Sequence, residues 1–284
     1  MLYEKFEKHW KIWLWIPIIL LVLSIGVILY NIQTTGSFMK RDIELMGGKS
    51  LTFEVSSANI EELKTQLPYA TIHLTSGVVK NLIIEMPLDK DEKEVIDIVS
   101  KSVATNGPPT VIEIGPSIGA IFFQQAQLAL ILAFVFMAIT VFVLFRSPVP
   151  STIVVLAAAT DIIVTVAVLS AIGVSLSMPV LAALITLIGY SVDTDLLLTS
   201  ELLRGGHHEI RDGVKRAMKT GLTFTATTLV ALFAMYFVSG SIIIEEIALV
   251  LIIGLIVDLP ATWMANVGIL RAWLERRNRK RGIA

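Results

Sequence analysis

Cysteine is absent from the 284-residue sequence, and charged residues make up only 17% of it. The first absence excludes disulfides, thiolate metal sites and cysteine nucleophiles. The second, together with a hydrophobic content of 55% and a mean hydropathy of +0.76, indicates a membrane protein. The net charge of −1 gives no sign of nucleic-acid binding.

Histidine is also scarce, with four residues in the chain. His207 and His208 lie together in a polar loop. A pair of loop histidines is most often solvated surface. The sequence therefore predicts neither a metal site nor a cofactor.

Hydrophobic stretches dominate the rest of the chain. Six of them approach or exceed the about 20 residues that a helix needs to cross the apolar core of a bilayer. They span residues 12–30, 121–145, 152–172, 178–201, 221–238 and 242–270. The first apolar run is too long for the core of a signal peptide, and no small-residue cleavage site follows Tyr30. We therefore expect six transmembrane helices in a polytopic α-helical protein.

Basic residues indicate the orientation of these spans. They precede the first span (Lys5, Lys8, Lys11), fill the loop after the fourth and form the tail after the sixth, whereas the loops 173–177 and 239–241 contain none. The positive-inside rule then places both termini in the cytosol of a cell-membrane protein. The expected parts are an N-terminus with the first helix (1–32), an extracytoplasmic domain (33–119), a five-helix bundle (120–271) and a basic tail (272–284).

Between the first two spans the periodicity changes. The alternation typical of strands occurs at 51–55, 70–74, 80–86 and 110–114, and amphipathic helices are expected at 57–67 and 89–105. Thr75-Ser76-Gly77 is typical of a hairpin turn. The order β-α-β-β-α-β is that of a ferredoxin-like α+β domain. Its charges are spread as on a solvated face, so a binding or lever role is expected rather than catalysis.

Two glycine clusters flank this domain. Gly47 and Gly48 precede the first strand, and Gly115, Pro116 and Gly119 join the last strand to the second span. One interpretation is a pair of ordinary boundary turns. The other is a pair of hinges, because glycine permits unusual dihedral angles and proline restricts the residue before it.

Four aspartates lie within the hydrophobic spans, where a buried charge is costly and marks a functional candidate. Asp161 lies in the third span, Asp193 and Asp195 in the fourth and Asp258 in the sixth. The helical rise places them in one layer, roughly 12–18 Å from the cytosolic face. Residues two apart cannot share a helix face. We expect Asp193 to face the interior.

The sequence places no lysine or arginine at that depth. Carboxylates without a cationic partner in a low dielectric tend to take up protons, and neighbouring acids couple their titrations, as a proton relay requires. The alternative is that neutral acids bond to neighbouring hydroxyls and only hold the bundle together. In the fifth span, Thr220, Thr223 and Thr227 either bond across helices or line a water path past the acids.

The stretch Ile188-Gly189-Tyr190-Ser191-Val192-Asp193-Thr194-Asp195 resembles the SecF family of protein-export membrane proteins, in which Gly-Tyr-Ser leads into an acidic pair. Three further motifs agree in the same order: Gly47-Gly48, Gly115-Pro116-Ser117-Ile118-Gly119 and Ala226-Thr227-Thr228-Leu229. Bacterial members typically show Asn-Asp at Asp193-Thr194 and an arginine near Lys219 and Thr220. The pattern is therefore more similar to archaeal members.

This resemblance implies one half of a pseudo-symmetric twelve-span assembly of the RND type, with SecD as the other half. It also implies a non-enzymatic role beside the Sec translocation channel, in which the protein assists secreted preproteins. Coupling to the proton motive force, or to another ion gradient, would use the intramembrane aspartates. The expected partners are SecD, the channel, translocating preproteins and membrane lipid.

Three other functions compete with this one. An RND-type half-transporter for a small molecule or lipid would share the acids but usually carries larger outer domains. An intramembrane aspartyl protease would use Asp193 and Asp258, but its Tyr-Asp and Gly-x-Gly-Asp signatures are absent. A structural partner without ion coupling would keep the acids only for packing.

Overall fold

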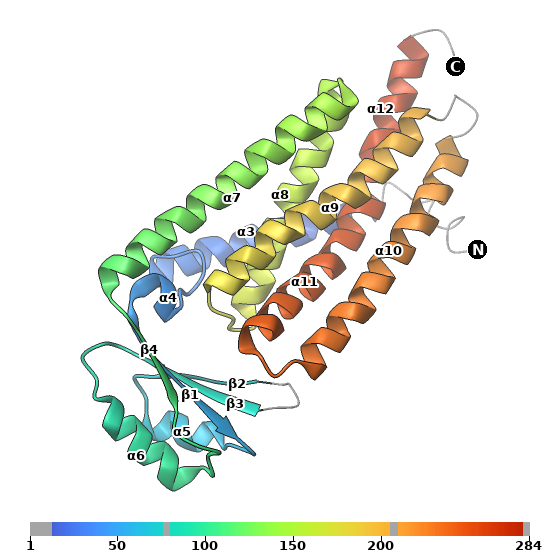
Figure 1. Ribbon diagram of the computed structural model, residues 1–284. Coiled ribbons are helices and arrows are strands. Elements are labelled where there is room, and N and C mark those ends of the chain that lie inside the picture. The colour runs from blue at the N-terminus through green and yellow to red at the C-terminus, as the bar shows by residue number, and fades with distance from the viewer. Residues whose placement is uncertain (1–12, 76–79, 205–209, 281–284) are drawn as a thin grey trace.

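The computed structural model describes residues 13–75, 80–204 and 210–280. Long helices lie side by side in a bundle, and a four-stranded antiparallel sheet with two short helices lies at one end of it (Figure 1). We refer to residues 48–114 as the αβ domain and to the long helices with their connections as the helix bundle. His207, His208, Lys5, Lys8, Lys11, Ser76 and Gly77 lie outside the described residues.

The bundle consists of helices α3 (Trp15–Thr35), α7 (Pro116–Phe145), α8 (Pro148–Ala171), α9 (Met178–Arg204), α10 (Ile210–Val238), α11 (Ile242–Pro260) and α12 (Val267–Lys280). Among the described residues, five helices are long and apolar enough to cross a membrane: α3, α7, α8, α9 and α10. The sixth expected span corresponds to α11 and its continuation. Over its 19 residues α11 carries Glu245, Glu246 and Asp258.

Prolines and left-handed residues mark the helix ends. Pro116 and Pro148 are the first residues of α7 and α8, where a missing N–H breaks no helical hydrogen bond. Gly36 ends α3 with a φ of 73°. Pro260 ends α11, and a π-helical turn, η1 (Ala261–Asn266), follows it before α12 continues to Lys280. The sixth expected span thus contains an irregular turn, and its helix runs on into the expected basic tail.

The αβ domain has the predicted order of elements: β1 (Gly48–Val55), α5 (Ile60–Gln66), β2 (Thr71–Leu74), β3 (Lys80–Met86), α6 (Glu92–Ser102) and β4 (Thr110–Ile114). The strand order in the sheet is β2-β3-β1-β4. α6 is shorter than expected because Asp91 caps its N-terminus and Val103 is already extended.

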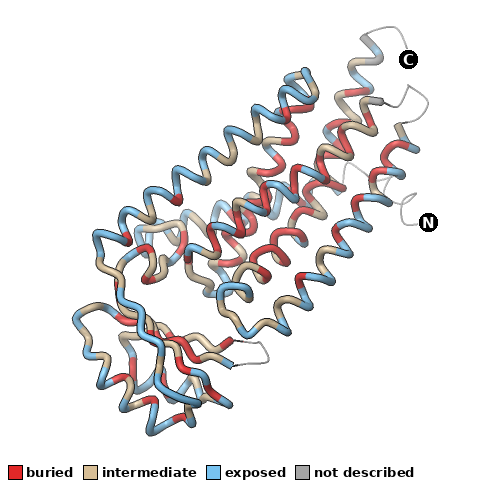
Figure 2. The backbone as a smooth tube through the Cα atoms, in the orientation of Figure 1, coloured by how far each residue is buried: buried red, intermediate tan, exposed pale blue. Residues whose placement is uncertain are grey.

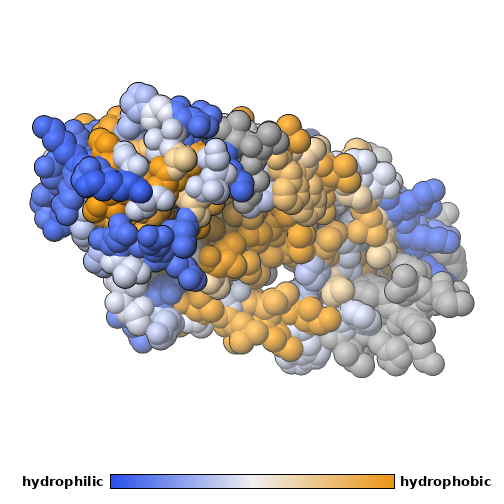
Figure 3. Space-filling model, turned by 90° about the horizontal axis from the view of Figure 1, so that it is seen from below, coloured by the Kyte–Doolittle hydropathy of each residue, from blue (hydrophilic) through white to orange (hydrophobic). Residues whose placement is uncertain are grey.

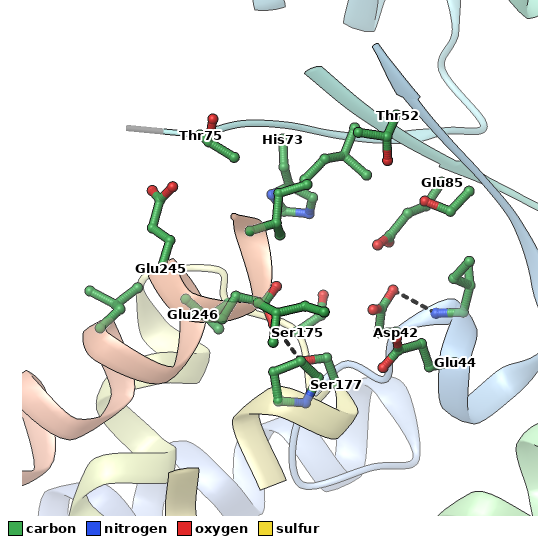
Figure 4. A pocket seen from close by; sticks show the side chains of 18 of the residues that line it. Asp42, Glu44, Thr52, His73, Thr75, Glu85, Ser175, Ser177, Glu245 and Glu246 are labelled. Carbon is green, nitrogen blue, oxygen red and sulfur yellow. Dashed lines mark hydrogen bonds between the residues drawn. The ribbon is translucent and has the colours of Figure 1, made fainter. Parts of the chain in front are cut away.

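The two faces of this sheet differ in chemistry. Alternate residues of β1 and β3, such as Phe53 and Ile84, pack against α5 and α6 in an apolar core. The opposite face carries Thr52, His73 and Glu85 and turns toward the end of the bundle (Figures 1 and 4). The sheet therefore presents a mixed surface to the ends of the helices, in which Ile83 and Ile112 accompany the polar side chains.

Burial is uneven across the bundle. Buried residues concentrate on α8, α9 and α11, whereas α3, α7 and α10 are mostly exposed (Figure 2). Seen from below, hydrophobic surface forms a band between the hydrophilic αβ domain and a hydrophilic patch at the other end (Figure 3). A hydrophobic band around a bundle fits immersion in a bilayer.

A short helix that the sequence did not predict, α4 (Ile43–Met46), connects α3 to the αβ domain. The Asp42 side chain accepts a hydrogen bond from the Ile43 N–H and caps it. Met39 and Leu45 are fully buried within the core of the bundle. The segment before Gly48 therefore packs into the bundle core and also contacts the αβ domain, for example through the bond from Lys40 Nζ to Thr71 Oγ1.

Candidate functional site

Three aspartates meet inside the bundle. Asp161 on α8, Asp195 on α9 and Asp258 on α11 have exposed fractions of 0%, 1% and 0%. They come from the three most buried helices, which pack directly on one another. Of the four aspartates that the sequence predicts in one layer, the structure buries these three together inside the bundle. We call these three residues the buried acid cluster.

Hydroxyl and amide groups hold the cluster in place. The Ser191 hydroxyl donates to Asp161 Oδ2 at 2.5 Å. Thr262 Oγ1 lies 3.0 Å from Asp195 Oδ1 and 2.9 Å from Asp258 Oδ1, and Asn266 Nδ2 donates to Asp195 Oδ1 at 2.5 Å. Thr262 and Asn266 both belong to the π-helical turn η1. This irregular turn therefore supplies the donors for Asp195, as π turns often do at functional sites.

The partners of the cluster are neutral side chains. The single hydroxyl proton of Thr262 cannot fully serve both Asp195 and Asp258. Within the described residues, no ion pair involves these acids, and one oxygen of each has no donor. The three carboxyls are therefore held by neutral donors and not by a cation of the described residues.

Two further buried hydroxyls lie one helical turn from the acids. Thr165 follows Asp161 by four residues on α8, and Thr199 follows Asp195 by four on α9, and both are fully buried. Neither hydroxyl has a hydrogen-bond partner among the described residues. Because α8 runs toward the αβ domain and α9 runs away from it, these hydroxyls extend the polar interior in opposite directions (Figure 1).

Asp193 does not belong to the cluster. The prediction that it faces the interior is wrong: Asp193 is exposed, and Asp195 is buried in its place. The buried stripe of α9 contains Leu187, Ser191, Asp195 and Leu198, with a spacing of three to four residues. That spacing was available in the sequence and identifies Asp195. Asp193 instead shares the exposed face with Thr186 and Tyr190.

The threonines that the sequence suggests as a polar path along the fifth span do not reach the buried acid cluster. Thr220, Thr223 and Thr227 are exposed on α10. The Thr223 hydroxyl donates to the Lys219 carbonyl, and the Thr227 hydroxyl donates to carbonyls of its own helix. These hydroxyls satisfy their hydrogen bonds locally, which any threonine on a helix can do.

The flanking glycines form a tightly packed joint. Gly47 has a φ of +87°, and a Cβ built on it would lie 2.7 Å from the Pro116 backbone. A Cβ on Gly119 would lie 2.8 Å from Gly47 N, and one on Gly48 would lie 2.8 Å from Ile43 Cγ2. Close backbone approach therefore explains glycine at these three positions. Only Gly115 has nothing within 4 Å of a built Cβ.

Metal ligands do not converge in the part of the chain that the structure describes. No group of three or more acidic or histidine side chains there is arranged to hold a metal ion. Asp193 and Asp258, the pair that an aspartyl protease would need, lie on the exposed and buried sides of their helices.

The fold and the cluster define a multi-pass membrane protein with titratable groups inside its helix bundle. The family model of the protein-export membrane proteins SecD and SecF, C-terminal region, matches residues 95–276. The protein-export membrane protein SecF of Pyrococcus furiosus is 36% identical and covers 93% of this chain, which in turn covers 91% of that protein. The corresponding SecF of Methanothermobacter thermautotrophicus is 34% identical, with coverages of 98% and 97%.

A solved structure shares the fold. The crystal structure of SecDF, a translocon-associated membrane protein from Thermus thermophilus, superimposes with a TM-score of 0.76 at 20% identity over 95% of this chain. The chain spans 38% of the length of that SecDF protein. The chain belongs to the SecD/SecF family of protein-export membrane proteins, and its similar relatives are archaeal SecF proteins.

Proposed function

We propose that this chain is a non-enzymatic accessory subunit of the Sec export machinery that works with SecD to assist the translocation of secreted preproteins. We further propose that it couples this work to an ion gradient through Asp161, Asp195 and Asp258. One observation supports the coupling: three buried carboxyls from three helices have only neutral hydrogen-bond donors, and no ion pair among the described residues involves them.

Proton transfer at the cluster would change how three helices pack. Adding or removing a proton changes the charge of a group that touches α8, α9 and η1 at once. A charge in a low-dielectric interior is costly, so the bundle would favour different arrangements in the two protonation states. The buried hydroxyls of Thr165 and Thr199 extend the polar interior on either side of the cluster. They are the proposed path for protons to and from it.

The exposed face of α9 supports a partner within the membrane. Thr186, Tyr190 and Asp193 are exposed there in the single chain. An aspartate that faces lipid is costly, so such a face is expected to be covered by protein. We propose that SecD covers it and completes the twelve-span assembly, with Asp193 at the junction.

We also propose six membrane spans, with α11 as the sixth. It packs against α8, α9 and α10. The αβ domain is proposed to be ferredoxin-like and extracytoplasmic, with both termini cytosolic, because the basic residues gather at the opposite ends of the helices. Single cysteines at Lys93 and Lys215 test this orientation. An impermeant maleimide should label only the first from outside the cell, and the reverse labelling would overturn it.

Paired substitutions test the coupling. Asp195→Asn keeps an acceptor for Thr262 and Asn266 but can no longer exchange a proton. Export into membrane vesicles in the presence of a proton or sodium gradient should fall to its level without the gradient. Asp193→Asn is the matched control two residues away, and it should retain gradient-stimulated export. Full stimulation in Asp195→Asn, at equal membrane levels of protein, would show that the acids only hold the bundle together.

A further inference from the structure

A cavity separates the αβ domain from the bundle. Its volume is about 400 Å³, and it lies between the open face of the sheet and the ends of the helices (Figure 4). The sheet contributes Thr52, His73 and Glu85, and the bundle contributes Asp42, Glu44 and residues of the loop 172–177 and the start of α11. The two parts therefore face each other across a space lined by both acidic and apolar side chains.

Hydrogen bonds join the two parts across this space. The Lys40 ammonium donates to Thr71 Oγ1 at 2.8 Å, and Asn81 Nδ2 donates to the Gly240 carbonyl at 3.0 Å. The Glu85 side chain on β3 points toward the Asp42 carboxyl across the cavity that both residues line (Figure 4). Thr71 is the cross-strand neighbour of Glu85. Glu85 therefore occupies the point of the sheet that meets the bundle.

Asp42 is fixed to the bundle. Its N–H donates to the Leu176 carbonyl at 2.9 Å in the loop between α8 and α9, and its side chain caps α4. Glu44 on the same short helix accepts the Met178 N–H at 2.9 Å. Hence one carboxyl of the Glu85–Asp42 pair moves with the αβ domain and the other with the bundle.

Acidic groups predominate around the pair. Glu85 faces Asp42 and Glu44 on the α4 side, Lys40 before them, His73 on β2, and Glu245 and Glu246 on α11. Burial lowers the pKa of His73, and burial raises the pKa of Glu44. Burial, followed by the neighbouring Asp42 carboxyl, raises the pKa of Glu85 to about 10, although Lys40 acts in the opposite direction. Two carboxyls that face each other at a buried site favour holding a proton between them.

We propose that the Glu85–Asp42 pair is a proton-dependent latch that holds the αβ domain against the helix bundle. The latch goes beyond the proposed coupling in the membrane, because it uses no residue of the buried acid cluster. Moving the domain away exposes Glu85 to water, where its pKa returns to its ordinary value of 4.5. Closure therefore takes up a proton.

The closed arrangement of the αβ domain is favoured at low pH. The closed arrangement is fully favoured below the pKa of the open state and is lost as the pH rises through the range from 4.5 to about 10. Within that range, one proton bound on closure lowers the ratio of closed to open molecules by up to about tenfold per pH unit. Acid on the side of the membrane that carries the αβ domain closes the latch, and alkali releases it.

Distances between two spin labels test the latch in the full chain in lipid nanodiscs. The chain has no cysteine, so only engineered sites are labelled. Lys93 on α6 and Ala171 at the end of α8 are exposed and suit the labels. Thr75 and Gly173 suit them less, because Thr75 is buried and Gly173 has a φ of +84°. The wild type should show a short, narrow distribution at pH 5 and added longer distances at pH 9.

Substitutions separate the latch from general pH effects. Glu85→Gln can donate permanently to Asp42, so its distribution should stay short at both pH values. Glu85→Ala removes the donor and should give the longer distances at both. Glu113→Gln, an exposed glutamate on β4, is the matched control and should keep the wild-type response. An identical wild-type distribution at pH 5 and pH 9, or a wild-type response in Glu85→Gln, would overturn the proposal.

Discussion

Gly119→Ala should destabilise the chain, because the added methyl group has no room. A Cβ there would lie 2.8 Å from Gly47 N and 3.0 Å from the carbonyl carbons of Leu45 and Met46. All three are backbone atoms, so no side-chain rotation relieves the contact. Either α4 must shift away from α7 or α7 must bend at its first turn. Such overpacking typically costs about 1–3 kcal/mol.

A second effect acts in the opposite direction. Gly119 lies within α7, and alanine is favoured over glycine in a helix by about 1 kcal/mol. Since the clash is with rigid backbone, the overpacking cost should lie in the upper part of its range. The net loss of stability should then be about 1–2 kcal/mol. Gly115→Ala provides the control four residues away, because its φ of −69° and ψ of 148° suit alanine. That change should be neutral or stabilising by about 0.4–1 kcal/mol.

Equilibrium unfolding of the purified chain in mild detergent measures both changes. We expect a lower unfolding midpoint for Gly119→Ala and an equal or higher midpoint for Gly115→Ala. The same pair separates packing from hinge motion. If Gly115 is a hinge, its alanine variant should narrow the spin-label distance distribution without loss of stability. Equal stability of Gly119→Ala and the wild type would show that α4 and α7 are not packed as described.

Two further predictions concern the interior of the bundle. Thr262→Val removes the hydroxyl that contacts Asp195 and Asp258 while keeping its shape. Loss of this shared donor should lower the free energy of unfolding by about 1–2 kcal/mol, and an unchanged unfolding midpoint would contradict the bridge. Gly254→Val places methyl groups where the Leu187 side chain lies and should destabilise by about 1–3 kcal/mol in the same assay. Gly189→Ala is its control, since a built Cβ there meets nothing within 4 Å, and equal effects of the two changes would refute the packing argument.

Much of the fold could be predicted from the sequence, because two signals in it are long and regular. The hydrophobic runs gave the positions of the membrane helices, and the change to strict alternation gave the order of elements in the αβ domain. The wrong prediction concerned which side of the helix Asp193 occupies. It rested on depth in the membrane, which is nearly the same for Asp193 and Asp195. The side of the helix is set instead by its stripe of packed residues, which includes Ser191 and Leu198.

Other features depend on contacts that local sequence does not encode. α4 has only four residues, too few to form a stable helix alone, and it exists because Leu45 is buried in the bundle core. The π turn follows Pro260, but a proline in a helix more often causes a kink or an end. Its geometry is fixed by the bonds from Thr262 and Asn266 to Asp195 on another helix. The Glu85–Asp42 pair consists of residues 43 positions apart that face each other only after both parts have folded.

The two groups of carboxyls are linked by one helix. α11 begins at the cavity, where Glu246 lines the wall and accepts a hydrogen bond from Ser177 at 2.6 Å, and it carries Asp258 of the buried acid cluster twelve residues later. Those twelve residues correspond to about 18 Å along the axis. A displacement of α11 that accompanies a proton change at Asp258 therefore also moves the wall that faces Glu85. Because coupling between two binding equilibria is reciprocal, closure of the latch would in turn bias proton binding at the cluster. On this view α11 is the element through which the proposed ion coupling in the membrane reaches the αβ domain.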